Sequence, residues 1–319
     1  LNNPMLTSSN NYNNGDDDEN SVHIRPDWIN PKLYPFKSRW IDIEGHHIHY
    51  IDEGQGPLLL FVHGIPTWSF YYRNIIKKLQ NNFRCVALDL PGFGLSKAPR
   101  NFEYCLKNES RIFDQFVRAL NLSDITMIAH SIGGPIGLKL ATTDPERFIG
   151  LVLSGTFAWP LKGVRFLSLM GSPLGAFMVD TNLFIRFFLN KGIYLRHLTE
   201  EEKLAYSRPF SKLSNRHPIH LLFRSIMKSS DYLNDIEQGL KNLRHLPILL
   251  VNGDMDNGVK AGFDSRFEKM FPRSSSLLIK GGAHFAIEEA PNQVSDVIRS
   301  WRMRPENEVG SNYNRSIQR

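Results

Sequence analysis

The sequence predicts an α/β fold in which helices flank a mostly parallel, eight-stranded sheet. Continuous apolar runs such as Leu58–Val62 lack the alternation of a half-exposed strand, which is typical of strands buried on both faces. These runs alternate along the chain with segments of helical periodicity, and this order indicates parallel strands joined by right-handed crossovers. The alternation stops between residues 157 and 235, where the pattern is helical throughout. With 319 residues, the chain is long enough for one large domain that carries an insertion.

The expected strands and helices follow from this periodicity. Residues 39–43 and 46–53 are expected to form a hairpin around a turn at Glu44-Gly45. Further strands are expected at residues 58–62, 83–90, 125–128, 148–153, 246–251 and 276–279. Helices are expected at residues 70–79, 107–120, 135–143 and 259–270, with a last helix that ends near Trp301.

We expect five segments along the chain. Residues 1–24 are rich in Asn, Ser and Asp and bury too little apolar surface to offset the entropy of ordering. They are expected to be disordered, as are residues 305–319. Residues 25–156 and 236–304 are expected to form the two parts of one α/β core. Between them, residues 157–235 interleave aromatic side chains with arginines and are expected to form a helical cap over the strand ends.

Composition and charge exclude several classes of protein. The two cysteines, Cys85 and Cys105, do not make a disulfide framework. The net charge of +6 comes from scattered Lys and Arg without a basic run, which argues against a nucleic-acid partner. No apolar run approaches the roughly 18 residues of an integral membrane span, and the first residues show no signal-peptide pattern. We therefore expect a cytoplasmic protein, although the missing initiator Met leaves open whether a leader has been removed. The oligomeric state is also open.

The stretch from Ile125 to Gly134 carries the strongest functional signal. A β-branched, apolar strand ends abruptly in Ala129-His-Ser131-Ile-Gly133, and a helical segment follows at once. Small residues at positions 129 and 133 are needed where a sharp, strained turn would otherwise bring Cβ atoms into collision. Such a nucleophile elbow lifts Ser131 clear of the sheet. The alternative is an ordinary strand-to-helix turn with a solvated serine.

An acid and a histidine follow Ser131 in the chain order of a catalytic triad. Asp254 and Asp256 come directly after one expected strand, and His284 comes after the next. Because the active site of a parallel sheet lies at the carboxyl ends of its strands, we expect these side chains to meet there. Either Asp254 or Asp256 fits the role of the acid. The alternative for His284 is a polar loop residue without a catalytic role.

Other polar residues have simpler explanations. His46, His47 and His49 could be taken for a metal cluster, but alternation puts His46 on the opposite strand face, and a solvated face is the favoured interpretation. Asp89 is expected to satisfy the backbone of the Gly-rich turn that follows it. His130 is expected to be a packing residue that points away from the site. We expect no metal and no organic cofactor.

Four motifs together resemble the haloalkane dehalogenase-like branch of the α/β-hydrolase superfamily. They are His63-Gly-Ile-Pro-Thr-Trp-Ser-Phe-Tyr-Tyr-Arg73, Asp89-Leu-Pro-Gly-Phe-Gly-Leu-Ser96, Pro145-Glu-Arg147 and Gly281-Gly-Ala-His284, and the resemblance covers about residues 38–303. It implies the α/β-hydrolase fold with an inserted helical cap. It also implies that Asp256 is the acid, with Asp254 the alternate, and that the backbone N–H groups of Ile65 and Ile132 form an oxyanion hole.

Three departures from that branch change the expected chemistry. The dehalogenases carry an Asp nucleophile, a Trp directly after it and commonly an Asn after the His-Gly dipeptide, where this chain has Ser131, Ile132 and Ile65. A serine hydroxyl that displaced a halide would leave a stable ether, whereas an Asp makes an ester that water can cleave. Dehalogenation and epoxide hydrolysis are therefore not expected, and acyl transfer is.

We therefore predict a serine hydrolase that cleaves a carboxylic ester or similar small acyl compound through an acyl-enzyme. The predicted catalytic residues are Ser131, His284 and Asp256. The residues predicted to line the substrate pocket are Trp68, Phe157, Trp159 and Phe285. Lactone hydrolysis, C–C bond hydrolysis and perhydrolysis use the same triad and stay open. The alternative from another class is a ligand-binding protein on a hydrolase frame, with little turnover.

Overall fold

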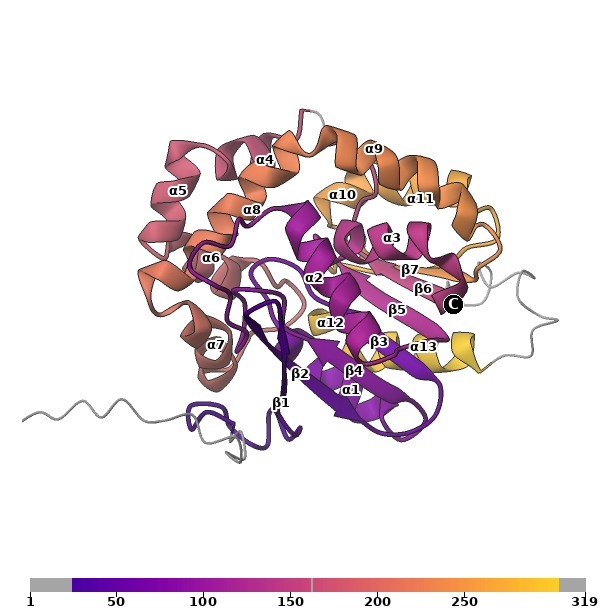
Figure 1. The fold of residues 1–319 in the computed structure, drawn as a ribbon, viewed down its shortest axis with the longest axis horizontal. Coiled ribbons are helices and arrows are strands. Elements are labelled where there is room, and N and C mark those ends of the chain that lie inside the picture. Colours follow the sequence, from indigo (N-terminus) through magenta and orange to yellow (C-terminus); the bar gives the residue numbers. More distant parts are fainter. Residues whose placement is uncertain (1–24, 162, 304–319) are drawn as a thin grey trace, which may run out of the picture.

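A computed structural model of the chain describes residues 25–161 and 163–303. Their strands form one eight-stranded sheet with the order β1-β2-β4-β3-β5-β6-β7-β8 (Figure 1). The strands are β1 (Arg39–Ile43), β2 (His46–Glu53), β3 (Leu58–Val62), β4 (Arg84–Leu88), β5 (Ile125–His130), β6 (Phe148–Ser154), β7 (Ile248–Gly253) and β8 (Ser275–Ile279). β2 pairs antiparallel with β1 and β4, and every other neighbouring pair is parallel. The predicted α/β fold with a mostly parallel, eight-stranded sheet is confirmed.

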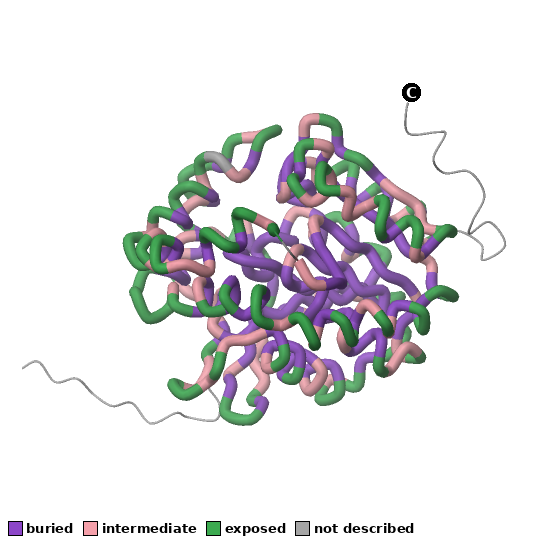
Figure 2. The backbone as a smooth tube through the Cα atoms, turned by 90° about the horizontal axis from the view of Figure 1, so that it is seen from above, coloured by how far each residue is buried: buried purple, intermediate pink, exposed green. Residues whose placement is uncertain are grey.

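Both faces of the sheet are buried, as the continuous apolar runs indicated. In β3, Leu60 belongs to one hydrophobic cluster and its neighbour Phe61 to another, because successive side chains point to opposite faces of a strand. The helices that cover the two faces are α1 (Arg73–Leu79), α2 (Leu106–Ala119), α3 (Gly133–Thr143) and α13 (Pro291–Arg302). α2 packs with α3 over the first cluster, and α1 packs with α13 over the second. Figure 1 shows these pairs on opposite sides of the sheet, and Figure 2 shows the strands as the buried centre.

In the described part of the chain, six α-helices lie between β6 and β7. They are α4 (Arg165–Met170), α5 (Pro173–Asp180), α6 (Leu183–Lys191), α7 (Glu200–Ser207), α8 (His217–Lys228) and α9 (Ser230–Gly239). We refer to the chain between Ser154 and Ile248 as the helical insertion. α4 to α8 lie to the left of the sheet in Figure 1, and the insertion joins the sheet again at β7. It occupies the place in the chain where the cap is expected, and the cap boundaries 157–235 remain a prediction.

Three predicted helices are interrupted in the structure. The helix expected at residues 70–79 begins as a 3₁₀ helix, Ser69–Tyr72, before α1. The helix expected at residues 259–270 is two helices, α10 (Asn257–Lys260) and α11 (Phe263–Met270), because Gly262 between them has a left-handed φ of 82°. The last helix is divided into α12 (Ala286–Glu289) and α13, because the proline that opens α13 keeps the residue before it out of the helical region.

The predictions of disorder at the two ends of the chain concern residues that the structure does not describe. Residues 1–24 and 305–319, which we expect to be disordered, lie outside the described residues. Within residues 25–161 and 163–303, no helix combines the length and hydropathy that crossing a bilayer requires.

Candidate active site

Ser131 stands at a strained turn between β5 and α3. Its φ of 54° lies in the left-handed region, which residues with a side chain occupy rarely. Its backbone N–H donates to the carbonyl of Ser154 at 3.1 Å, at the end of the neighbouring strand β6. A Cβ on Gly133 would lie 2.3 Å from the carbonyl oxygen of Val62, so only glycine fits two residues after the serine. The local geometry is that of a nucleophile elbow.

The loop after β3 passes close to Ser131. A Cβ on Gly64 would lie 2.4 Å from the Cβ of Ser131, so glycine lets the two backbones approach. Thr67 closes this loop, since both its N–H and its hydroxyl donate to the carbonyl of Gly64, at 2.9 and 2.8 Å. The backbone N–H groups of Ile65 and Ile132 make no hydrogen bond with any residue that the structure describes. Their role as an oxyanion hole remains a prediction.

His284 is paired with Asp256 at the carboxyl ends of β7 and β8. His284 Nδ1–H donates to Asp256 Oδ2 at 2.6 Å, and the other oxygen of Asp256 accepts the backbone N–H of Gly258 at the start of α10. The carboxylate is buried, whereas the side chain of His284 is 38% exposed. Among the described residues, His284 Nε2 has no hydrogen-bond partner, and no hydrogen bond joins it to Ser131 Oγ. The pair is thus formed, and the nitrogen that faces away from the acid is open.

The charges of this pair support each other. Burial alone would raise the pKa of Asp256, but the ring of His284 outweighs it by charge and hydrogen bond, and the pKa lies at about 2. Desolvation alone would lower the pKa of His284, but Asp256 outweighs it, and the pKa is raised from its usual value. Asp256 therefore stays ionised at neutral pH, and it holds His284 in the tautomer whose Nε2 can accept a proton.

Asp254, the alternate acid, has another partner. Its Oδ1 accepts the backbone N–H of Gly281 at 2.7 Å, in the loop that carries His284. A second carboxylate holds the same loop, because Glu289 accepts the N–H of Ala283 at 2.6 Å. Of the two candidate acids, the structure brings Asp256 to the imidazole and places Asp254 under the backbone of the loop.

His130 lies against His284. The two ring centroids are 4.8 Å apart, and His130 Nε2 donates to the backbone carbonyl of His284 at 2.9 Å. Burial, followed by the nearby charge of His284, holds the pKa of His130 well below its usual value, so the ring is neutral. The prediction of a packing residue agrees with its burial against Tyr71, but the prediction that it points away from the site is wrong. The local pattern gave no indication of a contact across 154 residues.

The four predicted pocket residues lie in different surroundings. Phe285 is beside His284, at 5.1 Å between ring centroids, and packs on Phe188 of α6 at 4.5 Å. Trp68 is fully buried, stacks on Phe70, and donates its indole N–H to the carbonyl of Ala205 at 3.2 Å.

Trp159 lies farther along the insertion, where its ring is 4.8 Å from that of Phe267 in α11 and carries the guanidinium of Arg266 at 4.3 Å. Phe157 is buried in the same hydrophobic cluster as Ile132. Phe285 contacts the ring of the candidate catalytic residue His284. The pocket roles of all four residues remain predictions.

Two of the three clustered histidines are buried, so the prediction of a solvated face is wrong for them. His49 donates from Nδ1 to Asp89 at 2.8 Å, and its Nε2 meets the hydroxyl of Ser38 at 3.0 Å. His46 donates to the carbonyl of Ile43 at 3.0 Å and packs its ring on Phe102. Residues from other parts of the chain, Asp89 and Ser38 for His49 and Phe102 for His46, cover the two rings, and alternation within one strand does not reveal them. No group of three or more His, Cys, Asp and Glu side chains suited to a metal is present in the part of the chain that the structure describes.

Asp89 behaves as the sequence predicts. One of its oxygens accepts the N–H of Leu95, in the Gly-rich turn, at 2.8 Å, and the other accepts the N–H of Ser69 at 2.8 Å. The residue is fully buried, and it therefore supports two loops rather than a reaction.

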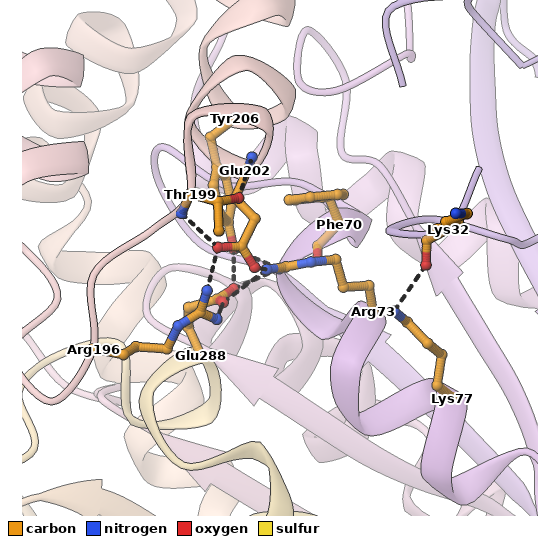
Figure 3. Close-up of polar contacts among 9 residues, drawn as sticks. All are labelled: Lys32, Phe70, Arg73, Lys77, Arg196, Thr199, Glu202, Tyr206 and Glu288. Atoms are coloured by element: carbon orange, nitrogen blue, oxygen red, sulfur yellow. Dashed lines mark hydrogen bonds and ion pairs between the residues drawn. The ribbon is translucent and has the colours of Figure 1, made fainter. Parts of the chain in front are cut away.

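The sequence prediction missed a buried ionic network behind the candidate site. Arg73, at the start of α1, is fully buried and pairs with Glu288 at 2.6 Å and with Glu202 of α7 at 2.5 Å (Figure 3). Arg196 of the insertion pairs with the same two carboxylates. Tyr206 donates to Glu288 as well. Since Glu288 lies in α12, four residues after His284, the network joins the histidine loop, the core and the insertion. Its signal in the sequence is the pair Glu288-Glu289 within an otherwise apolar stretch.

The chain is similar to known proteins over most of its length. Residues 57–291 match the family model described as alpha/beta hydrolase fold. The chain is 33% identical to haloalkane dehalogenase 2 of Mycobacterium tuberculosis over 285 residues, which are 87% of this chain and 98% of that protein. It is 30% identical to a cis-3-alkyl-4-alkyloxetan-2-one decarboxylase of Shewanella oneidensis, over 82% of this chain and 87% of that protein.

A solved structure shows the same fold. The haloalkane dehalogenase DbeA from Bradyrhizobium elkani superposes with a TM-score of 0.76 at 24% identity, over 83% of this chain and 96% of that chain. The family match, the relatives and the shared fold together mean that this chain belongs to the α/β-hydrolase fold family, in its haloalkane dehalogenase-like branch.

Proposed function

We propose that this protein is a serine hydrolase that cleaves a carboxylic ester, or a similar small acyl compound, through an acyl-enzyme. The observation that carries the proposal is the combination of Ser131, held at a φ of 54° at the elbow, with the His284–Asp256 pair at 2.6 Å. A strained serine alone is compatible with a structural turn, and a His–Asp pair alone is compatible with packing. Acyl transfer requires both, and here both lie at the carboxyl ends of parallel strands of one sheet, Ser131 after β5 and the pair after β7 and β8.

The chemistry would proceed in two halves. Ser131 Oγ attacks the carbonyl carbon while its proton passes to Nε2 of His284, and the N–H groups of Ile65 and Ile132 receive the oxyanion. His284 then gives the proton to the leaving alcohol, which leaves the acyl group on Ser131. A water molecule, deprotonated by His284, cleaves this ester and restores the serine. Each oxyanion donor contributes roughly 3 to 4 kcal/mol of transition-state stabilisation in enzymes of this type.

The identity of the nucleophile separates this proposal from the activity named for the dehalogenase relatives. A dehalogenase reaction at Ser131 would displace a halide and leave a serine ether. Water does not hydrolyse such an ether under mild conditions, so the enzyme would stop after one turnover. Ser131 in place of a carboxylate therefore favours acyl substrates, although the fold and much of the sequence are shared.

A second candidate is the hydrolysis of a lactone. The Shewanella oneidensis relative is named for an oxetan-2-one, which is a four-membered cyclic ester. Attack of Ser131 on such a ring would form an acyl-enzyme that keeps the ring oxygen as a hydroxyl group. Water would then release a 3-hydroxy acid, whereas decarboxylation would release an alkene and carbon dioxide. The products of one substrate therefore distinguish the two reactions.

The first experiment compares turnover and binding. Hydrolysis of a chain-length series of p-nitrophenyl esters would be measured for the wild type and for Ser131→Ala, with 1-bromobutane as the dehalogenase control and a 3,4-dialkyl-oxetan-2-one as the lactone. Ester or lactone turnover that is lost in the Ala variant, without bromide release, supports the proposal. Bromide release would contradict it. Saturable binding of the same esters without turnover would favour the ligand-binding alternative.

Two further predictions remain proposals of the same kind. We propose that residues 157–235 act as a cap that shapes a pocket for a small-molecule substrate. A cytoplasmic location is likewise proposed. The reaction proposed above uses no cofactor.

A further inference from the structure

The outer side of the helical insertion exposes large apolar side chains. Fifteen large hydrophobic side chains of the described residues are exposed, and twelve of them lie within residues 157–235. Six form what we call the apolar face: Phe166 and Leu169 of α4, Leu174 and Phe177 of α5, and Leu183 and Phe187 of α6. Phe177 and Phe187 are each 57% exposed. Such a concentration on one segment differs from the scattered single residues of an ordinary surface.

The exposed residues follow the period of the helices that carry them. In α6, Leu183, Arg186 and Phe187 are spaced as i, i+3 and i+4, so they share the outward side of the helix. The inward side of the same helix carries Phe184 and Phe188, which are buried. α6 is therefore apolar on both sides. The inner side is explained by the core, and the outer side is not.

The three helices bring these side chains together. α5 packs against both α4 and α6, and α4 packs against α8. The ring of Phe166 lies 6.5 Å from that of Phe184 and 5.7 Å from that of Phe223 in α8, which connects the face to the interior. Figure 1 shows α4, α5 and α8 gathered at the upper left of the molecule. The apolar face is therefore carried by three helices of the insertion that pack in sequence, α4 on α5 and α5 on α6.

The same region is basic. Residues 157–235 carry eleven Lys and Arg against six Asp and Glu, so +5 of the net charge of +6 lies there. Arg165, Arg186 and Arg224 are exposed beside or within the apolar face, and none forms an ion pair with another residue that the structure describes. A second copy of the chain on this face would bring like charges together, which opposes self-association. A negatively charged partner would be attracted.

We propose that the apolar face docks reversibly on a lipid bilayer that contains anionic headgroups. Phe and Leu side chains flanked by arginines are the composition of segments that lie in the interface of a membrane without crossing it. The arginines would contact the headgroups, and the aromatic and leucine side chains would enter the boundary with the acyl chains. This inference does not depend on the proposed ester hydrolysis, because the apolar face contains none of the candidate catalytic residues.

Vesicle co-sedimentation tests the proposal with the full chain. The wild type should bind vesicles with about 30% phosphatidylglycerol and bind pure phosphatidylcholine about tenfold more weakly, because each basic residue near an anionic surface adds attraction. Raising NaCl from about 0.1 M to about 1 M shortens the Debye length from about 10 to about 3 Å and should release most of the protein.

Matched variants identify the surface. Phe177→Ser with Phe187→Ser, and separately Arg165→Glu with Arg186→Glu, should each lower the partition coefficient about tenfold or more. The controls are Leu278→Ser, an exposed leucine of β8, and Lys241→Glu with Arg244→Glu, which change equal charge outside the apolar face. Circular dichroism and the thermal midpoint show that each variant is folded.

Three results would overturn the proposal. The first is wild-type protein that ignores anionic vesicles. The second is loss of binding in the control variants to the same extent as in the apolar-face variants. The third is a dimer of the wild type in light scattering that becomes a monomer in Phe177→Ser with Phe187→Ser, since a second copy would then be the occupant of the face.

Discussion

Two His–Asp pairs in this molecule have nearly the same geometry and opposite surroundings. His284 donates from Nδ1 to Asp256 at 2.6 Å, and His49 donates from Nδ1 to Asp89 at 2.8 Å. Each acid has its pKa held below the usual value, with burial opposing the shift and the histidine outweighing it. The contact between ring and carboxylate is therefore not what distinguishes a candidate active site from a structural one.

The difference lies in the second ring nitrogen. His49 Nε2 meets Ser38 Oγ at 3.0 Å, and the side chains of His49 and Asp89 are fully buried. His284 Nε2 has no partner among the described residues, and the side chain of His284 is 38% exposed. A general base must exchange a proton with the substrate, so it needs one nitrogen held and the other open. A pair with both nitrogens occupied contributes only to stability.

The largest expected effect is the loss of activity in His284→Gln. Without the proton acceptor, kcat/KM for a p-nitrophenyl ester should fall about 10⁴-fold or more, as for other triad members. The thermal midpoint should also fall, because the buried carboxylate of Asp256 loses the imidazole that donates to it, so activity is compared per folded molecule. Steady-state kinetics and a thermal scan on one preparation measure both. Activity within tenfold of the wild type would remove His284 from the mechanism.

The matching substitution at the buried pair should act on stability. In His49→Gln, the carboxylate of Asp89 loses the imidazole that donates to it in a fully buried place, and the free energy of unfolding should fall by about 3 kcal/mol or more. Activity per folded molecule should stay near that of the wild type. Urea unfolding and active-site titration separate the two quantities. A stable protein without activity would mean that His49 takes part in the reaction.

The two aspartates of the loop after β7 sharpen the comparison further. Asp256→Asn should lower kcat about 10³- to 10⁴-fold, because an amide fails to hold the imidazole in the required tautomer. Asp254→Asn keeps an oxygen for the N–H of Gly281 and should cost about tenfold or less. The ratio of the two kcat values decides which residue is the acid. Equal losses would show that loop integrity, rather than the charge of Asp256, is what matters.

The pH dependence gives the smallest but most specific effect. Asp256 raises the pKa of His284 above its usual value of 6.5. As the pH falls, His284 should therefore become protonated, and so stop acting as a base, already above pH 6.5. The acid limb of kcat/KM should therefore lie above pH 6.5 in the wild type and move to lower pH in Asp256→Asn, measured with residual activity. A limb that does not move would assign it to another group.

The sign of the effect on stability follows from the same shifts. The raised pKa of His284 stabilises the fold below pH 6.5, and this contribution is lost as the pH rises through the folded-state pKa. The lowered pKa of Asp256 stabilises the fold above its usual value of 3.8, and this contribution is lost as the pH falls to about 2. The pair therefore stabilises the fold most between about pH 3.8 and pH 6.5. The unfolding free energy of the wild type minus that of Asp256→Asn should be largest in this range.

Local patterns in the sequence determined the sheet and the elbow. The unbroken apolar run of β3 has only one compatible place, the middle of a covered parallel sheet, and Gly133 after Ser131 permits a turn that other residues forbid. The order of Ser131, the Asp254–Asp256 loop and His284 also follows from chain order, because parallel strands bring their carboxyl ends to one edge. These features depend on neighbours in the chain.

Only the tertiary structure decided which groups meet. Asp254 and Asp256 are two residues apart in one loop, and packing alone turns Asp256 to His284 and Asp254 to the backbone of Gly281. His49 is buried because Ser38 and Asp89 come from other parts of the chain. Arg73 and Glu288 are 215 residues apart. Burial and charge pairing are sums over neighbours in space, so a sequence period that reports one helix or strand at a time does not contain them.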